Sequence, residues 1–240
     1  MIKTLTKLLI LVCICGFFVY LVSLIFSPIK YYKLDLKRES IAFAIPKNLD
    51  INGHTITEVR DQFEQDNKKI TVAMNGGMFN PLFQPVGLTI IDSVTAQPLV
   101  TKTTGFGNFF LQPNGVFSLT RDGRASVMTT AQFATINQSD ITHATQSGPM
   151  LVIDGVINPL FTVGSDNREI RNGVCVLDDD QVLFAISRRP INFYDFASFF
   201  KYHGCMNALY LDGSISKASI PSKLFNTDRN LGMVMVGYKK

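Results

Sequence analysis

Short apolar runs, each ended by glycine, proline, asparagine or aspartate, recur along most of this sequence and constrain its fold most strongly. Residues 174–177 and 182–187 flank Asp178-Asp179-Asp180-Gln181, so they predict a β-hairpin with a charged turn. Further hairpins are predicted around Gly105 to Gly107, Pro113-Asn114-Gly115 and Asp122-Gly123. Hydrophobic residues make up 46% of the chain, which is enough for one sizeable core. The pattern predicts an α+β fold with a mixed, mainly antiparallel β-sheet, several hairpins and a few packed helices.

Helices are predicted at three places. Thr55 and Glu58 form the pattern of a capping box ahead of apolar residues at helical spacing, which predicts a helix to about residue 67. Asn192 is positioned to cap a second helix, whose phenylalanines face the core and which Gly204 ends. A short helix is predicted within residues 131–136. Residues 31–40 read as a polar connector, and residues 41–45 as the first strand.

The N-terminus is different in kind. An uncharged apolar run covers residues 8–26, from Leu8 to Phe26, and about 20 such residues let a helix cross a bilayer. The run is either a cleaved signal peptide or an uncleaved anchor, and the bulky residues at its end favour the anchor. Basic residues ahead of it, Lys3 and Lys7, favour a cytoplasmic N-terminus and a body on the extracytoplasmic side. The sequence thus divides into a membrane segment, residues 1–30, and one domain, residues 31–240.

Charge and cysteine content narrow the possible partners and compartment. The formal net charge is +4, without a basic stripe or interleaved basic and aromatic residues, which argues against nucleic acid as a partner. Cys175 and Cys205 lie in the body; either they pair in an oxidising compartment or, the favoured interpretation, they stay two buried thiols.

Four segments break the local structure at predicted strand ends with glycine and a polar residue. Each alone is typical of a turn, but together they resemble a site built on a rigid scaffold. The segments are Asn75-Gly76-Gly77, Ser147-Gly148-Pro149, Arg171-Asn172-Gly173 and Asp212-Gly213-Ser214. Their chemistry is compatible: a guanidinium fork matches a phosphate, glycine amides bind anions or let a sugar approach, and carboxylate and amide groups orient a substrate.

These segments also carry a family resemblance. "AMNGGMFNPLFQPVGL", "TQSGPMLVIDGVINP", "REIRNGVCV" and "HGCMNALYLDGSIS" resemble, in order and approximate spacing, the motifs of the phosphodiester glycosidase family, and look most similar to its bacterial exported branch. The resemblance implies cleavage of a sugar from a phosphodiester, with a sugar phosphate or envelope polysaccharide as the substrate. It also implies one cleft lined by Asn75, Gly76, Gly77, Phe79, Gly148, Pro149, Arg171, Asn172, Asp212, Gly213 and Ser214, with Ser147 beside them.

The last motif departs from the family pattern. Animal members typically read Asn-Leu-Asp-Gly-Gly-Gly, whereas this chain has Tyr210-Leu211-Asp212-Gly213-Ser214-Ile215. Larger side chains therefore replace glycines, while the aspartate is kept. Two functions from different classes follow: an extracytoplasmic hydrolase, or a module that binds sugar phosphate or polysaccharide and has lost turnover.

The expected roles follow from the chemistry of glycosidic bond cleavage. Asp212 is predicted to act as acid/base or to stabilise an oxocarbenium-like transition state, Arg171 to clamp phosphate oxygens, and Asn75 to orient the substrate. A second carboxylate stays unassigned, because Asp154 and Glu169 both read as exposed turn or strand residues. Ser147 and Ser214 do not lie in a Gly-x-Ser-x-Gly motif, which argues against a serine hydrolase. His143 precedes the Ser-Gly-Pro motif and is a candidate to reach the cleft. Neither a metal nor a cofactor is expected.

Overall fold

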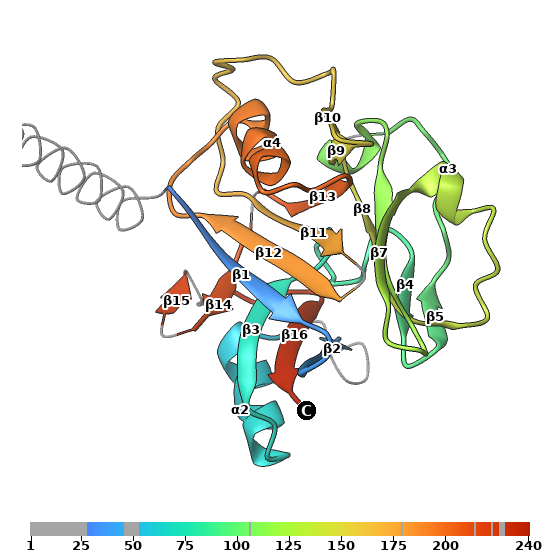
Figure 1. Ribbon diagram of the computed structural model, residues 1–240, viewed down its shortest axis with the longest axis vertical. Helices are drawn as coiled ribbons and strands as arrows, with labels where there is room; N and C mark the ends of the chain where they lie inside the picture. Colours follow the sequence, from blue (N-terminus) through green and yellow to red (C-terminus); the bar gives the residue numbers. More distant parts are fainter. Residues whose placement is uncertain are drawn as a thin grey trace, which may run out of the picture.

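Three antiparallel sheets form the body of the protein (Figure 1). The computed structural model describes residues 28–45, 53–105, 107–178, 180–213, 215–221, 223–225 and 229–240. In order across each sheet, the first contains β1 (Ile29–Asp35), β12 (Gln181–Ser187), β11 (Asn172–Asp178), β13 (Ala208–Asp212), β9 (Met150–Ile153) and β10 (Val156–Ile157). The second contains β15 (Lys223–Phe225), β14 (Ala218–Ile220), β3 (Ile70–Asn75), β16 (Val234–Lys239) and β2 (Glu39–Ala44). The third contains β5 (Val94–Gln97), β4 (Thr89–Ile91), β8 (Ile141–Ser147), β6 (Gly115–Thr120) and β7 (Ala125–Thr129).

The helices are few and short. They are α2 (Ile56–Gln65), α3 (Thr130–Phe133), α4 (Phe193–Tyr202) and the 3₁₀ helix η2 (Asn108–Phe110). At the start of α2, Thr55 Oγ1 accepts the amide of Glu58 at 3.1 Å while the Glu58 carboxylate accepts the amide of Thr55 at 2.8 Å, so the predicted capping box is confirmed. Asn192 caps α4 by accepting the amide of Asp195 at 2.8 Å, also as predicted.

The strand pairings confirm the predicted fold class. Every pairing between the described strands is antiparallel, and helices are interspersed among hairpins. The hairpins β11–β12 and β6–β7 form where the sequence predicts them, the second across Asp122-Gly123 with Gly123 at a φ of 84°.

Three local predictions are wrong. Gly107 precedes η2, and Pro113-Asn114-Gly115 leads from η2 into β6, so neither forms a hairpin turn. The expected connector at residues 31–40 is instead most of β1 and the start of β2. Its polar side chains alternate with buried ones such as Leu34, and the whole of β1 pairs with β12. An edge strand with one polar face is therefore easily mistaken for a connector.

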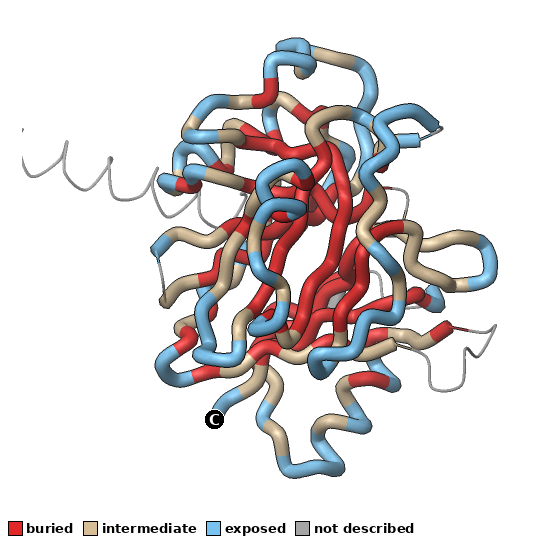
Figure 2. Tube along the Cα trace, turned by 90° about the vertical axis from the view of Figure 1, so that its right-hand side faces the viewer, coloured by how far each residue is buried: buried red, intermediate tan, exposed pale blue. Residues whose placement is uncertain are grey.

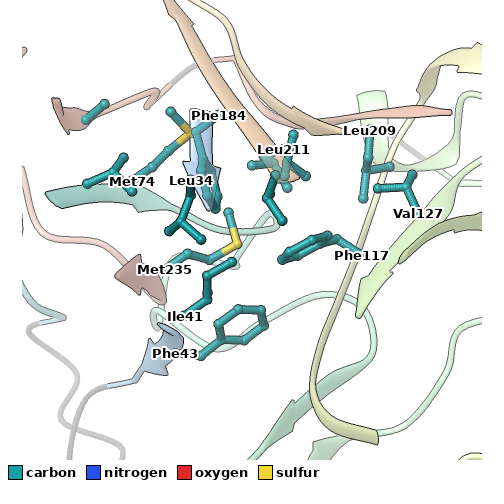
Figure 3. Close-up of a cluster of buried hydrophobic side chains, with 14 of the residues drawn as sticks. Leu34, Ile41, Phe43, Met74, Phe117, Val127, Phe184, Leu209, Leu211 and Met235 are labelled. Atoms are coloured by element: carbon teal, nitrogen blue, oxygen red, sulfur yellow. The ribbon is translucent and has the colours of Figure 1, made fainter. Parts of the chain in front are cut away.

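A common core fills the space between the three sheets. Alternate residues of each strand point into it, as the period of two in a strand requires. Figure 3 shows ten of these side chains converging from all three sheets: Leu34, Ile41, Phe43, Met74, Phe117, Val127, Phe184, Leu209, Leu211 and Met235. Complete burial of such a side chain contributes about 1.5–3 kcal/mol, so this cluster fixes the sheets against one another. Figure 2 shows the buried strands in the middle of the molecule and the exposed segments around them.

The outer face of each sheet is covered by a helix. Phe193, Phe196 and Phe200 of α4 pack on the first sheet, and this confirms that they are core residues. Ile56 and Val59 of α2 pack on the second sheet, and α3 packs on the third. The face of β13 under α4 includes Tyr210, which the site uses.

A disulfide joins the first sheet to the end of α4. Cys175 of β11 and Cys205, just after the helix, are bonded, with their Cα atoms 6.1 Å apart. The interpretation of two separate thiols was therefore wrong. The helix turns its C-terminal end back onto β11, a proximity that the 30 residues between the cysteines do not reveal.

The apolar run at residues 8–26 lies outside the described residues. Among the residues that are described, no helix is both long enough and apolar enough to span a membrane. The division into a membrane segment and a single domain stays a prediction, and β1 of the folded body begins at Ile29.

Candidate functional site

Four strand ends, drawn from all three sheets, meet at one place. Asn75 is the last residue of β3, Asn172 the first of β11, Asp212 the last of β13 and Ser147 the last of β8. These are the four segments that the sequence marks with glycine and a polar residue. Because the sheets close on a common core, their strand ends are brought together at its rim.

The side-chain amide of Asn172 links two of these strand ends. Its Nδ2 donates to the backbone O of Asn75 at 2.9 Å and to Asn75 Oδ1 at 3.0 Å. Its Oδ1 accepts the backbone N–H of Asp212 at 2.9 Å. Asn172 is fully buried, so its amide is a structural bridge that sets the distance between β3 and β13.

The Ser147-Gly148-Pro149 segment is tied to the same strand. Ser147 Oγ donates to the backbone O of Leu211 at 2.8 Å, and the backbone N–H of Tyr210 donates to the O of Pro149 at 3.2 Å. The Gly148–Pro149 peptide is cis. The segment therefore binds β13 on the side opposite Asn172 and helps to hold the strand that ends in Asp212.

The paired glycines after β3 lie close to β8. The backbone N–H of Gly77 donates to Thr145 Oγ1 at 3.2 Å, and a Cβ at Gly77 would lie 2.6 Å from the backbone O of Gln146. Only glycine permits this approach. Gly76 donates its N–H to the O of Met233 at 3.1 Å. These two amides are thus used within the protein.

Asp212 is the least buried of the four residues at the strand ends. It is 7% exposed, whereas Asn75, Asn172 and Arg171 are completely buried. Its Oδ1 accepts the backbone N–H of Ile215 at 3.4 Å, which is a weak bond by its length. A carboxylate held at the edge of a buried polar network is the arrangement expected of a preorganised catalytic group.

Arg171 is bound on every side by the protein. Its Nε donates to the O of Ile191 at 2.8 Å, its Nη2 donates to both the O and Oδ1 of Asn167 at 2.9 Å, and its Nη1 donates to Tyr210 Oη at 3.2 Å. The ring of Phe193 lies 3.6 Å from the guanidinium carbon. Burial lowers the pKa of Arg171, with the nearby Tyr210 opposing the shift.

These contacts bear on the role predicted for Arg171, which stays a prediction. Four of the five guanidinium N–H groups have protein acceptors, so one N–H, on Nη1, is left. A bidentate clamp on a phosphate needs two parallel N–H groups. The described contacts therefore fit a residue that positions its surroundings better than they fit a free phosphate clamp.

Tyr210 was missed by the sequence reasoning. Its Oη accepts from Arg171 and, at 3.4 Å, from Asn108 Nδ2, and burial raises its pKa, which keeps the hydroxyl protonated. A Cβ placed on Gly213 would lie 1.7 Å from Tyr210 Oη and 3.4 Å from Arg171 Nη1, so only glycine fits after Asp212. In the sequence, the departure of residue 210 from the family motif was the one sign that Tyr210 belongs to the site. The sequence gave no such sign for the residues that contact Arg171 or Tyr210, namely Asn167, Asn108 and Phe193.

Asn75 carries a buried donor without a partner. Its Oδ1 accepts from Asn172 Nδ2 and, at 2.8 Å, from the backbone N–H of Lys217, while its Nδ2 makes no hydrogen bond in the described structure. Exchanging the amide O and N would direct Nδ2 at two donors, so the hydrogen bonds fix the orientation. A buried, unpaired N–H costs about 1–3 kcal/mol, so a bound water or another acceptor at Nδ2 would stabilise the fold.

The other predicted site residues are placed less centrally. Phe79 stacks on Phe83 with ring centroids 5.6 Å apart and packs with the α2 cluster, so none of its described contacts is with the four strand ends. Ser214 lies outside the described residues.

Asp154 is exposed in the β9–β10 turn, and Glu169 is exposed in an isolated bridge to Ile191, as predicted for both. Within the described ranges, no three His, Cys, Asp or Glu residues are grouped to hold a metal ion.

His143 belongs to a different part of the molecule. Its Nε2 lies 3.4 Å from Asp92 Oδ1, and both residues line a cavity of about 550 Å³ together with Glu39, Asp122 and Lys240. None of the four strand ends lines this cavity. The suggestion that His143 reaches the cleft was wrong, because its strand position points it between the second and third sheets.

We expect His143 to make stability depend on pH. Its pKa is lowered, chiefly because burial disfavours the charged imidazole, while Asp92 opposes the shift weakly. The unfolded chain takes up this proton near pH 6.5, so the free energy of unfolding should fall as the pH drops below about 6.5 and stop falling below the folded pKa. Denaturant unfolding at several pH values should show a shallower acid loss for His143→Gln than for wild type. Parallel curves for the two proteins would contradict this assignment.

Comparisons with known proteins agree with the fold and identify the family. The family model for phosphodiester glycosidases matches residues 68–231. An Escherichia coli (strain K12) protein, uncharacterized protein YigE, is 37% identical over 149 residues, which cover 62% of this chain and 57% of that protein; the chain thus spans little more than half of its relative.

Solved structures share the fold at low sequence identity. The catalytic domain of zebrafish N-acetylglucosamine-1-phosphodiester alpha-N-acetylglucosaminidase, auto-inhibited by its pro-peptide, is 14% identical with a TM-score of 0.58, covering 89% of this chain and 84% of that one. A protein from Burkholderia pseudomallei K96243, named as exported, is 12% identical with a TM-score of 0.59, covering 88% and 74%. Since the family model spans well over half of the sequence, this chain belongs to the phosphodiester glycosidase family.

Proposed function

We propose that the protein is an extracytoplasmic hydrolase that cleaves a sugar from a glycosyl phosphodiester, either a small sugar-phosphate diester or a diester within an envelope polysaccharide. The observation that carries the proposal is the meeting of four strand ends around Asp212, the least buried of the four strand-end residues. Family membership supports the reaction class, and the network supplies a candidate for each task the reaction needs.

The proposed chemistry breaks the bond between the anomeric carbon and the ester oxygen. Water adds to the anomeric carbon, the bonding electrons leave with the phosphate oxygen, and the products are a free sugar and a phosphomonoester. The carboxylate of Asp212 either takes the proton from water or stabilises positive charge at the anomeric carbon. A phosphate leaving group is already weakly basic, so the reaction does not require a second protein carboxyl group.

The surrounding residues orient these partners. The side-chain amide of Asn75 orients the substrate indirectly: its Oδ1 fixes Asn172 and Lys217 behind Asp212, while its Nδ2 is itself completely buried. Arg171 holds the hydroxyl of Tyr210 beside Gly213, and its buried guanidinium places a positive charge behind the strand that ends in Asp212. Positive charge in this position favours a phosphate close to Asp212 even without a bidentate clamp.

The location is supported by three features. Disulfides persist in oxidising compartments, and Cys175–Cys205 is one. The apolar run at residues 8–26 has the composition of a membrane segment, and one structural neighbour is named as exported.

The test uses the full chain in detergent with N-acetylglucosamine 1-phosphate esters of both anomers in H₂¹⁸O. We expect equal amounts of free sugar and phosphomonoester, with ¹⁸O in the sugar, because water attacks carbon. Label in the phosphomonoester would show cleavage of the phosphorus–oxygen bond and overturn the glycosidase assignment. Tight binding without products would establish the rival function, a sugar-phosphate binding module.

A further inference from the structure

A hollow at the start of the folded body has no role in the site described so far. Its volume is about 510 Å³, and its lining comes from the start of β1, the segment ahead of β11 and the loop between β12 and α4 (Figure 1). Ile29 of β1 pairs with Ser187 at the end of β12, and the backbone N–H of Arg188 donates to the O of Pro28 at 2.7 Å. These bonds hold the start of β1 against the loop, so the hollow is built into the fold.

Two arginines in this lining have no partner in the protein. Arg168 and Arg189 are exposed, and neither guanidinium forms a hydrogen bond, an ion pair or a ring contact within the described part of the chain. The lining also contains one carboxylate, that of Asp195, whose Oδ2 accepts from Asn192 Nδ2 at 3.0 Å. Two positive groups and one negative group leave a charge of +1. The hollow therefore favours a ligand with a single negative charge, and guanidinium groups suit phosphate oxygens.

The sequence places this hollow beside the predicted membrane segment. Pro28 lines the hollow and lies two residues beyond Phe26, where the apolar run ends. Two residues of chain span at most about 7 Å. The headgroup layer on each side of a bilayer is about 5–7 Å thick. With the run at residues 8–26 in the bilayer, the hollow therefore lies at the depth of the lipid headgroups or just above them.

We propose that the hollow binds the headgroup of an anionic phospholipid, with the lipid phosphate in contact with Arg168 and Arg189. Such a headgroup is a phosphodiester with one negative charge, and anionic lipids attract basic groups next to a membrane segment. The volume of about 510 Å³ is in the range of small-molecule sites, about 300–1,000 Å³. The inference is independent of the hydrolase chemistry and rests on the predicted membrane segment.

Docking at the hollow also orients the candidate site. Ile29 pairs with Ser187 in the first sheet. On the neighbouring strands, Asn172 pairs with both Ile186 and Asp212. The hollow and Asp212 thus lie at the same end of this sheet, three strand spacings or about 14 Å apart across it. A headgroup in the hollow holds the Asp212 end of the sheet close to the bilayer.

The test uses the full chain in nonionic detergent micelles, titrated with dihexanoylphosphatidylglycerol or with dihexanoylphosphatidylcholine. Native mass spectrometry counts the bound lipid and gives the dissociation constants. We expect the glycerol lipid to bind at least ten-fold more tightly than the choline lipid. The double variant Arg168→Gln/Arg189→Gln should weaken its binding by at least ten-fold. Arg121→Gln/Arg229→Gln removes the same charge from exposed positions outside the hollow and should bind like wild type.

The controls decide between a lipid site and its alternatives. Equal affinity for the two lipids, or equal losses in the two double variants, would overturn the headgroup site. Equally tight binding of glycerol 1-phosphate would make the hollow a site for a free phosphate ester and overturn the lipid as its occupant. Both double variants should keep wild-type kcat on a soluble glycosyl phosphodiester. A preparation that binds the glycerol lipid selectively but cleaves no diester would overturn the hydrolase function and leave this inference supported.

Discussion

Asp212→Asn should lower kcat by about 10²–10⁴-fold while the protein stays folded, because the substitution keeps the shape of the side chain and removes its charge. An asparagine retains an oxygen that can accept the Ile215 N–H, so the end of β13 should be preserved. The measurement is steady-state release of sugar from a glycosyl phosphodiester, with circular dichroism and denaturant unfolding on the same samples. KM is expected to change less than kcat, since a charge that acts in the transition state contributes little to ground-state binding.

Asp154→Asn is the matched control for this change. Asp154 is exposed in the turn between β9 and β10, with a φ of 47°, a conformation that asparagine tolerates. It should keep wild-type kcat. A fully active Asp212→Asn enzyme would remove the carboxylate from the mechanism, and equal losses in both variants would show that the effect is not local to the site.

Arg171→Lys should destabilise the protein by roughly 3–5 kcal/mol, although the charge is kept. The guanidinium satisfies acceptors on Ile191, Asn167 and Tyr210 at the same time, from one planar group stacked on a ring. A lysine ammonium cannot reach these acceptors together, and each acceptor left unpaired in a buried position costs about 1–3 kcal/mol. Urea unfolding of both proteins measures the loss.

Arg121→Lys provides the comparison, because Arg121 is exposed in the β6–β7 hairpin and should change stability by less than about 0.5 kcal/mol. Activity distinguishes positioning from direct binding by Arg171. We expect Arg171→Lys to lose stability and kcat together. Wild-type stability with a raised KM would instead mean that the guanidinium contacts the phosphate and that its protein contacts are of minor importance.

Sequence reasoning was most successful where the signal is local. The hairpin turns at residues 178–181 and Asp122-Gly123, the capping box at Thr55 and the cap at Asn192 all depend on residues within a few positions of one another. The four polar strand ends were also predictable, because glycine marks each of them. Their mutual contacts were not, since Asn75 and Asn172 are 97 residues apart.

The roles of buried polar groups were the hardest to predict. Arg171 was read as a phosphate ligand because arginine commonly serves that purpose, yet its acceptors lie 4 to 39 residues away along the chain and nothing in the sequence announces them. Tyr210 was hidden for the same reason. Cys175 and Cys205 could be paired only once the path of α4 over the first sheet was known.

The meeting of strand ends from three sheets has a consequence for how the protein is inactivated. The bonds around Asn75 join residues 97 and 142 positions apart, so they form only after long loops have closed. A fragment that contains all of them must span at least residues 75–217. Loss of order in any one sheet therefore abolishes the geometry as a whole, and catalytic activity becomes a sensitive reporter of whether the entire domain is intact.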